Sequence, residues 1–97
     1  QGCLGTGGGV VRLPDAVQRG VGQQPGLLVG QVRPESPAER AGLLLGDVMI
    51  AFDGAATETL GDLLALLSGE RVGREVEVQV LRGGELRTLR ATVGERG

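Results

Sequence analysis

The sequence lacks the side chains that most catalytic sites need. Its 97 residues include no histidine, lysine, tryptophan or tyrosine, and the one cysteine is Cys3. Without histidine or lysine there is no base that titrates near neutrality, which excludes a Ser-His-Asp or Cys-His pair, a Ser-Lys dyad and a Schiff base. A single cysteine without histidine cannot form an internal disulfide or complete a tetrahedral zinc site. We therefore expect a non-catalytic chain that uses no metal or cofactor.

The charge pattern and the short apolar runs exclude two further classes. Ten basic residues, all arginine, are interspersed with twelve acidic residues for a net charge of −2, and aromatic residues make up 1% of the chain. Nucleic-acid binding needs a basic stripe and aromatic platforms, so no such partner is expected. The apolar runs, such as 43–45, are only a few residues long and fall far short of the roughly 18 residues of a membrane span. The length fits one domain, and the lack of a signal sequence leads us to expect a mature product or a piece of a longer protein.

The first third of the chain is divided by glycine and proline. Five glycines within residues 1–9 predict a flexible loop that leads into a short strand. The proline that follows this strand suits the first turn of a helix, and we predict a helical turn over 15–19. The nearly continuous apolar stretch 27–32 predicts a strand that is buried on both faces.

Capping residues predict two helices in the remainder of the chain. Ser36, followed by proline and then glutamate three residues on, is typical of a helix start, and Gly42 suits the end of a short helix over 37–41. Thr59 can cap a second helix that stops at Gly69. Strands and tight turns account for the rest, with strands predicted over 48–52, 75–80 and 86–93 and turns at Asp53-Gly54 and Gly83-Gly84.

The second helix carries a stripe of leucines. At 100° per residue, Leu60, Leu64 and Leu67 lie within about 60° of one another, and Leu63 and Leu66 rotate off that face. We predict that the first three line a groove and that the other two face the core. The alternative is that all five leucines belong to the core.

The stretch VRPESPAERAGLLLGDVMI, residues 32–50, resembles the signature of PDZ domains in its Ser-Pro-Ala, Ala-Gly-Leu and Gly-Asp elements. Each element has a physical reason: Ala41 must be small where the helix meets the sheet, Gly42 takes the left-handed cap, and Asp47 can accept backbone N–H groups at the bend. The order of elements resembles the circularly permuted bacterial form found in HtrA-like serine proteases. The resemblance implies a mostly β fold with two short helices, a partly open β-sandwich or barrel. It covers 1–97 as one domain, with a binding loop at 1–9 and a core at 10–94.

The resemblance also implies a peptide-binding site. Backbone N–H groups of Leu4, Gly5 and Thr6 would hold a terminal carboxylate, and the edge from Thr6 to Val11 would pair with the peptide as an added strand. That edge consists of Thr6, Gly7, Gly8, Gly9, Val10 and Val11. Three successive glycines predict a soft edge that loses more entropy when it orders on binding. Because an added strand of a few residues buries little area, we expect roughly micromolar affinity. The alternative is that the glycine-rich start is only a linker.

Three hypotheses for function follow from the resemblance. The favoured one is a module that reads C-terminal or exposed hydrophobic tails of unfolded or regulatory proteins for a parent serine protease in protein quality control. The second is a regulatory or scaffolding domain that contacts its own protease domain or subunits, and the third is a PDZ domain of a tail-specific or intramembrane protease. The resemblance implies a periplasmic or other extracytoplasmic location, free or tethered to a membrane through the parent.

Overall fold

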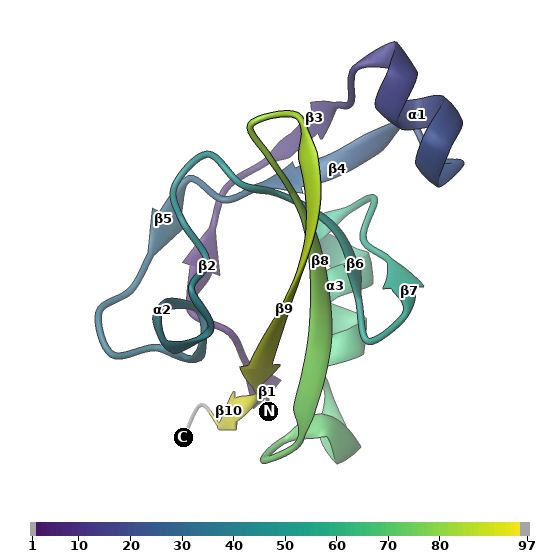
Figure 1. Ribbon diagram of the computed structural model, residues 1–97. Helices are drawn as coiled ribbons and strands as arrows, with labels where there is room; N and C mark the ends of the chain where they lie inside the picture. Colours follow the sequence, from purple (N-terminus) through teal and green to yellow (C-terminus); the bar gives the residue numbers. More distant parts are fainter. Residues whose placement is uncertain (1, 96–97) are drawn as a thin grey trace.

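The structure, a computed structural model, describes residues 2–95, so Gln1 of the predicted loop and residues 96–97 of the predicted domain lie outside it. An antiparallel sheet in the order β3-β4-β6-β8-β9, with β7 beside β6, forms the body of the molecule (Figure 1). Two small antiparallel sheets, β1 with β10 and β2 with β5, flank it. The strands are β1 (Gly2–Cys3), β2 (Thr6–Gly7), β3 (Val10–Arg12), β4 (Pro25–Leu28), β5 (Gln31–Val32), β6 (Val48–Phe52), β7 (Ala55–Ala56), β8 (Glu75–Arg82), β9 (Glu85–Thr92) and β10 (Gly94–Glu95).

Three α-helices and a short 3₁₀ turn accompany the strands in residues 2–95, where the sequence predicted two helices and a helical turn. They are α1 (Asp15–Val21), α2 (Pro37–Ala41), α3 (Leu60–Leu67) and η1 (Gly69–Arg71). The predicted turn over 15–19 extends to Val21 because Val17 and Val21 pack on a cluster of buried side chains, and a left-handed Gly22 ends the helix only after them. Packing therefore outweighs the cost of the glycine inside this helix.

The predicted strand over 27–32, buried on both faces, is wrong. The chain divides there into β4, which belongs to the main sheet, and β5, which pairs with β2. Leu28 is 36% exposed, and the N–H of Gly30 donates to the carbonyl of Gly7 across 2.7 Å. The break lets one apolar stretch serve two sheets.

The predicted flexible loop over residues 1–9 is also wrong, because it contains the paired strands β1 and β2. The other predicted helices, strands and turns are confirmed, with small shifts at their ends. The hydroxyl of Ser36 accepts from the N–H of Glu39 at the start of α2, and Gly42 ends the helix with φ +87°. Positive φ angles occur at both residues of the Asp53-Gly54 and Gly83-Gly84 turns, as tight hairpins require.

The main core joins the sheet to two helices. Ala38 of α2 and Leu63 and Leu67 of α3 belong to the same buried cluster as Phe52 and Val78 of the central strands. A second, smaller cluster of Leu13, Ile50 and Leu81 lies under α1. Both α2 and α3 are thus fixed against the sheet. Both also contribute residues to the pocket beside β2.

An ion pair between the buried Asp47 and the partly exposed Arg82 ties the α2–β6 connection to β8. Asp47 is 1% exposed and accepts two bonds of 2.8 Å from Nε and Nη2 of Arg82, and a third of 2.9 Å from the N–H of Leu44. Arg82 also donates to the carbonyl of Gly42, 2.9 Å away. Burial alone would raise the pKa of Asp47, but the bonds from Arg82 and Leu44 hold its pKa below the ordinary value. The sequence prediction that Asp47 accepts a backbone N–H is confirmed.

The helix that borders the candidate site depends on a capping box. The hydroxyl of Thr59 accepts from the N–H of Asp62 at 3.1 Å, and the Asp62 carboxylate accepts from the N–H of Thr59 at 3.1 Å. We expect Thr59→Ala to lower the free energy of unfolding by about 1 kcal/mol in urea denaturation. Thr59→Ser, which keeps the hydroxyl, should match the wild type. Equal loss in both variants would contradict a role for the cap.

Candidate functional site

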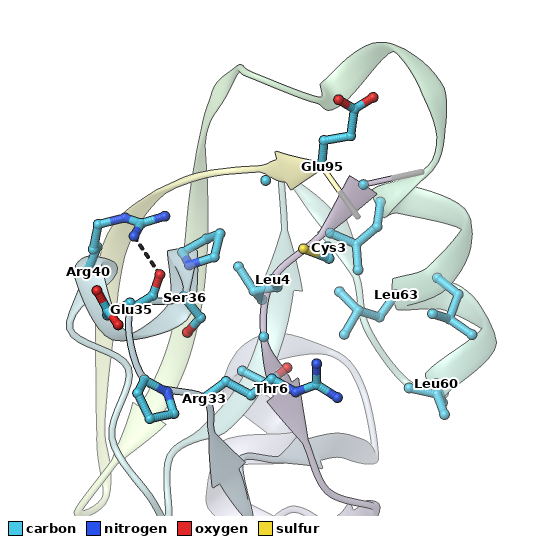
Figure 2. Close-up of a pocket in the computed structure, with 17 residues that line it drawn as sticks. Cys3, Leu4, Thr6, Arg33, Glu35, Ser36, Arg40, Leu60, Leu63 and Glu95 are labelled. Atoms are coloured by element: carbon cyan, nitrogen blue, oxygen red, sulfur yellow. Dashed lines mark hydrogen bonds between the residues drawn. The ribbon is translucent and has the colours of Figure 1, made fainter. Parts of the chain in front are cut away.

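A pocket of about 630 Å³ opens between the β1–β2 segment and α3 (Figure 2). The segment that enters α2 forms a second side, and β10 closes one end. A smaller hollow of about 30 Å³ continues along the same line, beside Gly7, Gly8 and Leu60. Together the two hollows form a groove between β2 and α3, which we call the β2–α3 groove.

The backbone of β2 presents one edge to this groove. Thr6 stands opposite Val32 of β5, and the neighbouring bond runs from the N–H of Arg33 to the carbonyl of Gly5 across 2.9 Å. In an antiparallel ladder this pattern marks a non-hydrogen-bonded pair, whose own N–H and C=O groups point away from the partner strand. The N–H and C=O of Thr6 are therefore directed toward the groove.

The loop before β2 is held in place by backbone contacts. The carbonyl of Leu4 accepts from the N–H of Ala38, 2.8 Å away, which fixes the loop to the start of α2. Gly5 has φ +89°, and a Cβ at this position would collide with the Cβ of Ser36. The residues predicted to bind a carboxylate, Leu4, Gly5 and Thr6, all line the pocket.

The glycine run is paired to the body of the protein, in contrast to the soft edge that the sequence predicted. The carbonyls of Gly7 and Gly9 accept from the N–H groups of Gly30 and Leu28 at 2.7 and 2.8 Å. Gly8 packs so closely on Leu28 that any Cβ would collide with the Leu28 carbonyl, whereas Gly9 has open space around it. Glycine at position 8 thus has a steric reason that the sequence alone does not reveal.

The helix wall of the groove shows two levels of leucines. Leu60 and Leu64 are 53% and 47% exposed, whereas Leu63 and Leu67 are each 5% exposed, and all four line the pocket. Leu66 packs against the core, as predicted. The structure therefore places Leu60 and Leu64 on the rim, and it places Leu67, predicted at the groove, beside Leu63 at the buried base. The alternative that all five leucines are core residues is wrong.

Part of the predicted pairing edge lies outside the groove. In the described part of the chain, Gly9, Val10 and Val11 line neither hollow. Val10 and Val11 belong to β3, the edge strand of the main sheet, where they pair with β4. The groove edge in residues 2–95 is therefore confined to Thr6, Gly7 and Gly8 of the predicted pairing residues.

Sequence reasoning missed the charged rim of the pocket. Arg33, Glu35, Arg40 and Glu95 all line it, and Nη1 of Arg40 donates to the carbonyl of Glu35. These residues come from segments that meet only after β5 pairs with β2 and β10 pairs with β1. Among residues 2–95, no group of three potential metal ligands lies together.

A strand edge with outward backbone groups, loop residues at a pocket and a helix with exposed leucines are an arrangement that suits the binding of an extended chain by strand addition. The sequence pattern of the family described as PDZ domain matches residues 12–93. The chain belongs to the PDZ domain family, and the resemblance found in residues 32–50 is confirmed.

Relatives come from bacterial serine proteases. The chain is 37% identical over 76 residues to a "Probable periplasmic serine endoprotease DegP-like" of Halomonas elongata, covering 78% of this chain and 16% of the relative. It is 38% identical over 69 residues to the "Serine protease Do-like HtrB" of Bacillus subtilis, covering 70% of this chain and 15% of the relative. The chain thus spans about a sixth of the length of these curated relatives.

Solved structures confirm the predicted fold. The "HtrA-type protease AlgW with decapeptide" matches 100% of this chain and 30% of its own, with 30% identity and a TM-score of 0.78. The HtrA3 PDZ domain bound to a phage-derived ligand matches 96% of this chain and 85% of its own, with a TM-score of 0.71 and 18% identity, a likeness of fold alone. The mostly β, PDZ-like architecture predicted from the sequence is therefore correct, with the correction to three helices.

Proposed function

We propose that this domain binds the C-terminal or exposed hydrophobic tails of other proteins in the β2–α3 groove. The observation that carries the proposal is the outward-facing backbone of Thr6, which lies across the pocket from the exposed leucines of α3. A peptide could extend the β2–β5 sheet through this backbone, since strand addition uses main-chain bonds for affinity and side-chain pockets for specificity. The decapeptide named for the similar AlgW structure supports the same class of ligand.

Each part of the groove has a separate task in this mechanism. Backbone N–H groups of the Leu4–Gly5–Thr6 loop would receive the terminal carboxylate, because successive N–H groups form a concave anion site. The last side chain of the peptide would enter the pocket toward Leu63 and Leu67, which are 5% exposed. Leu60 and Leu64 would cover the peptide from the rim.

The parent protein is, in our proposal, an HtrA-type serine protease that works outside the cytoplasm. The DegP-like and HtrB relatives support this proposal. The domain would then present protein tails to a catalytic unit that this segment does not contain, in line with its lack of histidine and lysine. Within residues 2–95, no helix is both long and apolar enough to cross a membrane.

The test of binding uses an eight-residue peptide with an apolar last residue, labelled at its N-terminus. We expect roughly micromolar affinity, NMR shift changes centred on Leu4–Gly8 and α3, and about tenfold weaker binding when the terminal carboxylate is amidated, because charge-assisted bonds to backbone N–H groups are lost. Shift changes elsewhere, or affinity that amidation leaves unchanged, would contradict the proposal and favour a surface role toward the parent's own domains.

A matched pair of leucines tests the helix wall. Leu64→Asp should weaken binding of the same peptide about tenfold, because it removes apolar contact and adds a charge on the rim. Leu86→Asp is the control: Leu86 lies on β9 and is 48% exposed, close to the 47% of Leu64, but it does not line the groove. Equal effects of the two variants on affinity would show that α3 is not part of the site.

A further inference from the structure

The sheet formed by β2 and β5 has an outer face that points away from the core. On this face, β2 and the residue before it present glycines to two exposed side chains of the β5 segment. Gln31 pairs with Gly7, and Arg33 follows β5 directly and bonds to Gly5 through its backbone. Both Gln31 and Arg33 are exposed, whereas Val32 between them packs against the main core, as the alternation of side chains along a strand requires. Because glycines stand opposite them, these two side chains meet no side chain of β2 at those positions.

The Arg33 side chain uses this bare surface to reach the groove. Arg33 lines the pocket although its backbone lies on the far side of β2 from α3. Figure 2 shows the side chain running past Thr6, with its guanidinium on the side toward Leu60. A positive charge therefore lies at the same pocket as Thr6, to whose backbone a peptide would pair.

This charge is available to a ligand. Of the ion pairs found among residues 2–95, none includes Arg33, whereas Arg12, Arg71, Arg82 and Arg90 each have an acidic partner. The second arginine of the pocket, Arg40, is held by the carbonyl of Glu35 at 2.6 Å. Figure 2 places Glu35 beside Arg40 and Glu95 at the opposite end of the pocket, so neither carboxylate neutralises Arg33.

The geometry points to Arg33 as a residue that makes the β2–α3 groove select peptides with an acidic side chain at the penultimate position. This inference rests on the proposed function. Side chains of an added strand alternate between its two faces, so when the last one enters the pocket the one before it lies on the outer face of β2. Arg33 lies across that same face. A glutamate or aspartate there would gain a charge-assisted contact with the guanidinium.

The experiment compares two labelled peptides that differ only in glutamate or glutamine at the penultimate position. At low salt we expect the glutamate peptide to bind wild-type protein about three to five times more tightly, the range of a partly exposed ion pair. This preference should shrink as salt is added. Arg33→Gln should bring the ratio of the two affinities close to one, while the control Arg40→Gln, a change in the same pocket, should leave the ratio as in the wild type.

The outcomes separate this inference from the proposed function. Equal affinities of the two peptides for the wild type, or a glutamate preference that survives in Arg33→Gln, would overturn the role of Arg33. Equal weakening of both peptides by Arg33→Gln would place the guanidinium on the terminal carboxylate and would also overturn it. Tail binding itself is tested by the glutamine peptide alone, whose affinity and sensitivity to amidation do not depend on Arg33 selectivity.

Discussion

Replacing Asp47 by alanine is expected to lower the free energy of unfolding by about 3 kcal/mol, a large fraction of the stability of a domain of this size. The carboxylate is 1% exposed and satisfies Arg82 and the N–H of Leu44, so its removal leaves these groups without their acceptor. Asp47→Asn keeps one acceptor but no charge and should lose less stability. Urea denaturation followed by circular dichroism measures the change.

The same pair predicts a pH dependence. Because the pKa of Asp47 in the folded protein lies below its ordinary value of 3.8, the pair contributes stability above that value and loses it as the pH falls through the folded pKa. The difference in stability between the wild type and Asp47→Ala should therefore be constant near neutrality and shrink in acid. Arg90→Met is the control, since Arg90 is 67% exposed and its ion pairs within residues 2–95 are to exposed glutamates. If the difference in stability between the wild type and Asp47→Ala stayed constant below pH 3.8, this account would be contradicted.

Substituting alanine at Gly8 is expected to damage both stability and peptide binding. Any Cβ there collides with the carbonyl of Leu28, so β2 must shift away from the strand behind it. Such overpacking costs about 2 kcal/mol, and the displaced edge should bind peptide about tenfold or more weakly. Urea denaturation and peptide titration measure the two effects.

Gly9 supplies the matched control for this prediction. It is the next residue in the same run, but apart from Gly9 itself and its two chain neighbours no heavy atom lies within 4 Å of the position that its Cβ would take. Gly9→Ala should therefore leave affinity and stability near those of the wild type. Comparable losses of affinity and stability in both variants would show that the glycine run is needed for its flexibility. The close approach of Gly8 to Leu28 would then not explain the losses.

Local signals were sufficient to predict most elements. Ser36 and Thr59 mark helix starts through hydroxyls that cap the nearby backbone, and the two glycines of Gly83-Gly84 allow the positive φ of a tight turn. These signals depend on a few consecutive residues, so they can be read without knowledge of the fold. The motif in residues 32–50 then placed these elements in a known order.

Features that depend on contacts between distant segments could not be predicted. The division of 27–32 into two strands follows from the pairing of β5 with β2, a segment more than twenty residues earlier in the sequence. The need for glycine at position 8 is set by Leu28, and the position of Arg33 at the pocket follows from the lack of a side chain at Gly5 and Gly7. In the same way, 100° spacing groups Leu67 with Leu60, but packing against the core decides that Leu67 is buried.

The pairing of β1 with β10 has a mechanical consequence. Gly2 stands opposite Glu95 and Cys3 opposite Gly94, so the ladder that closes one end of the pocket also joins the two ends of the described chain (Figure 1). A force that draws residues 2 and 95 apart would break the pairing of this ladder sequentially, first at Gly2–Glu95 and then at Cys3–Gly94. The lip of the pocket would then open before the eight-residue strands of the β8–β9 hairpin bear any tension. Tension on the domain would thereby change the shape of the pocket in which we propose that a tail binds, through the same four residues.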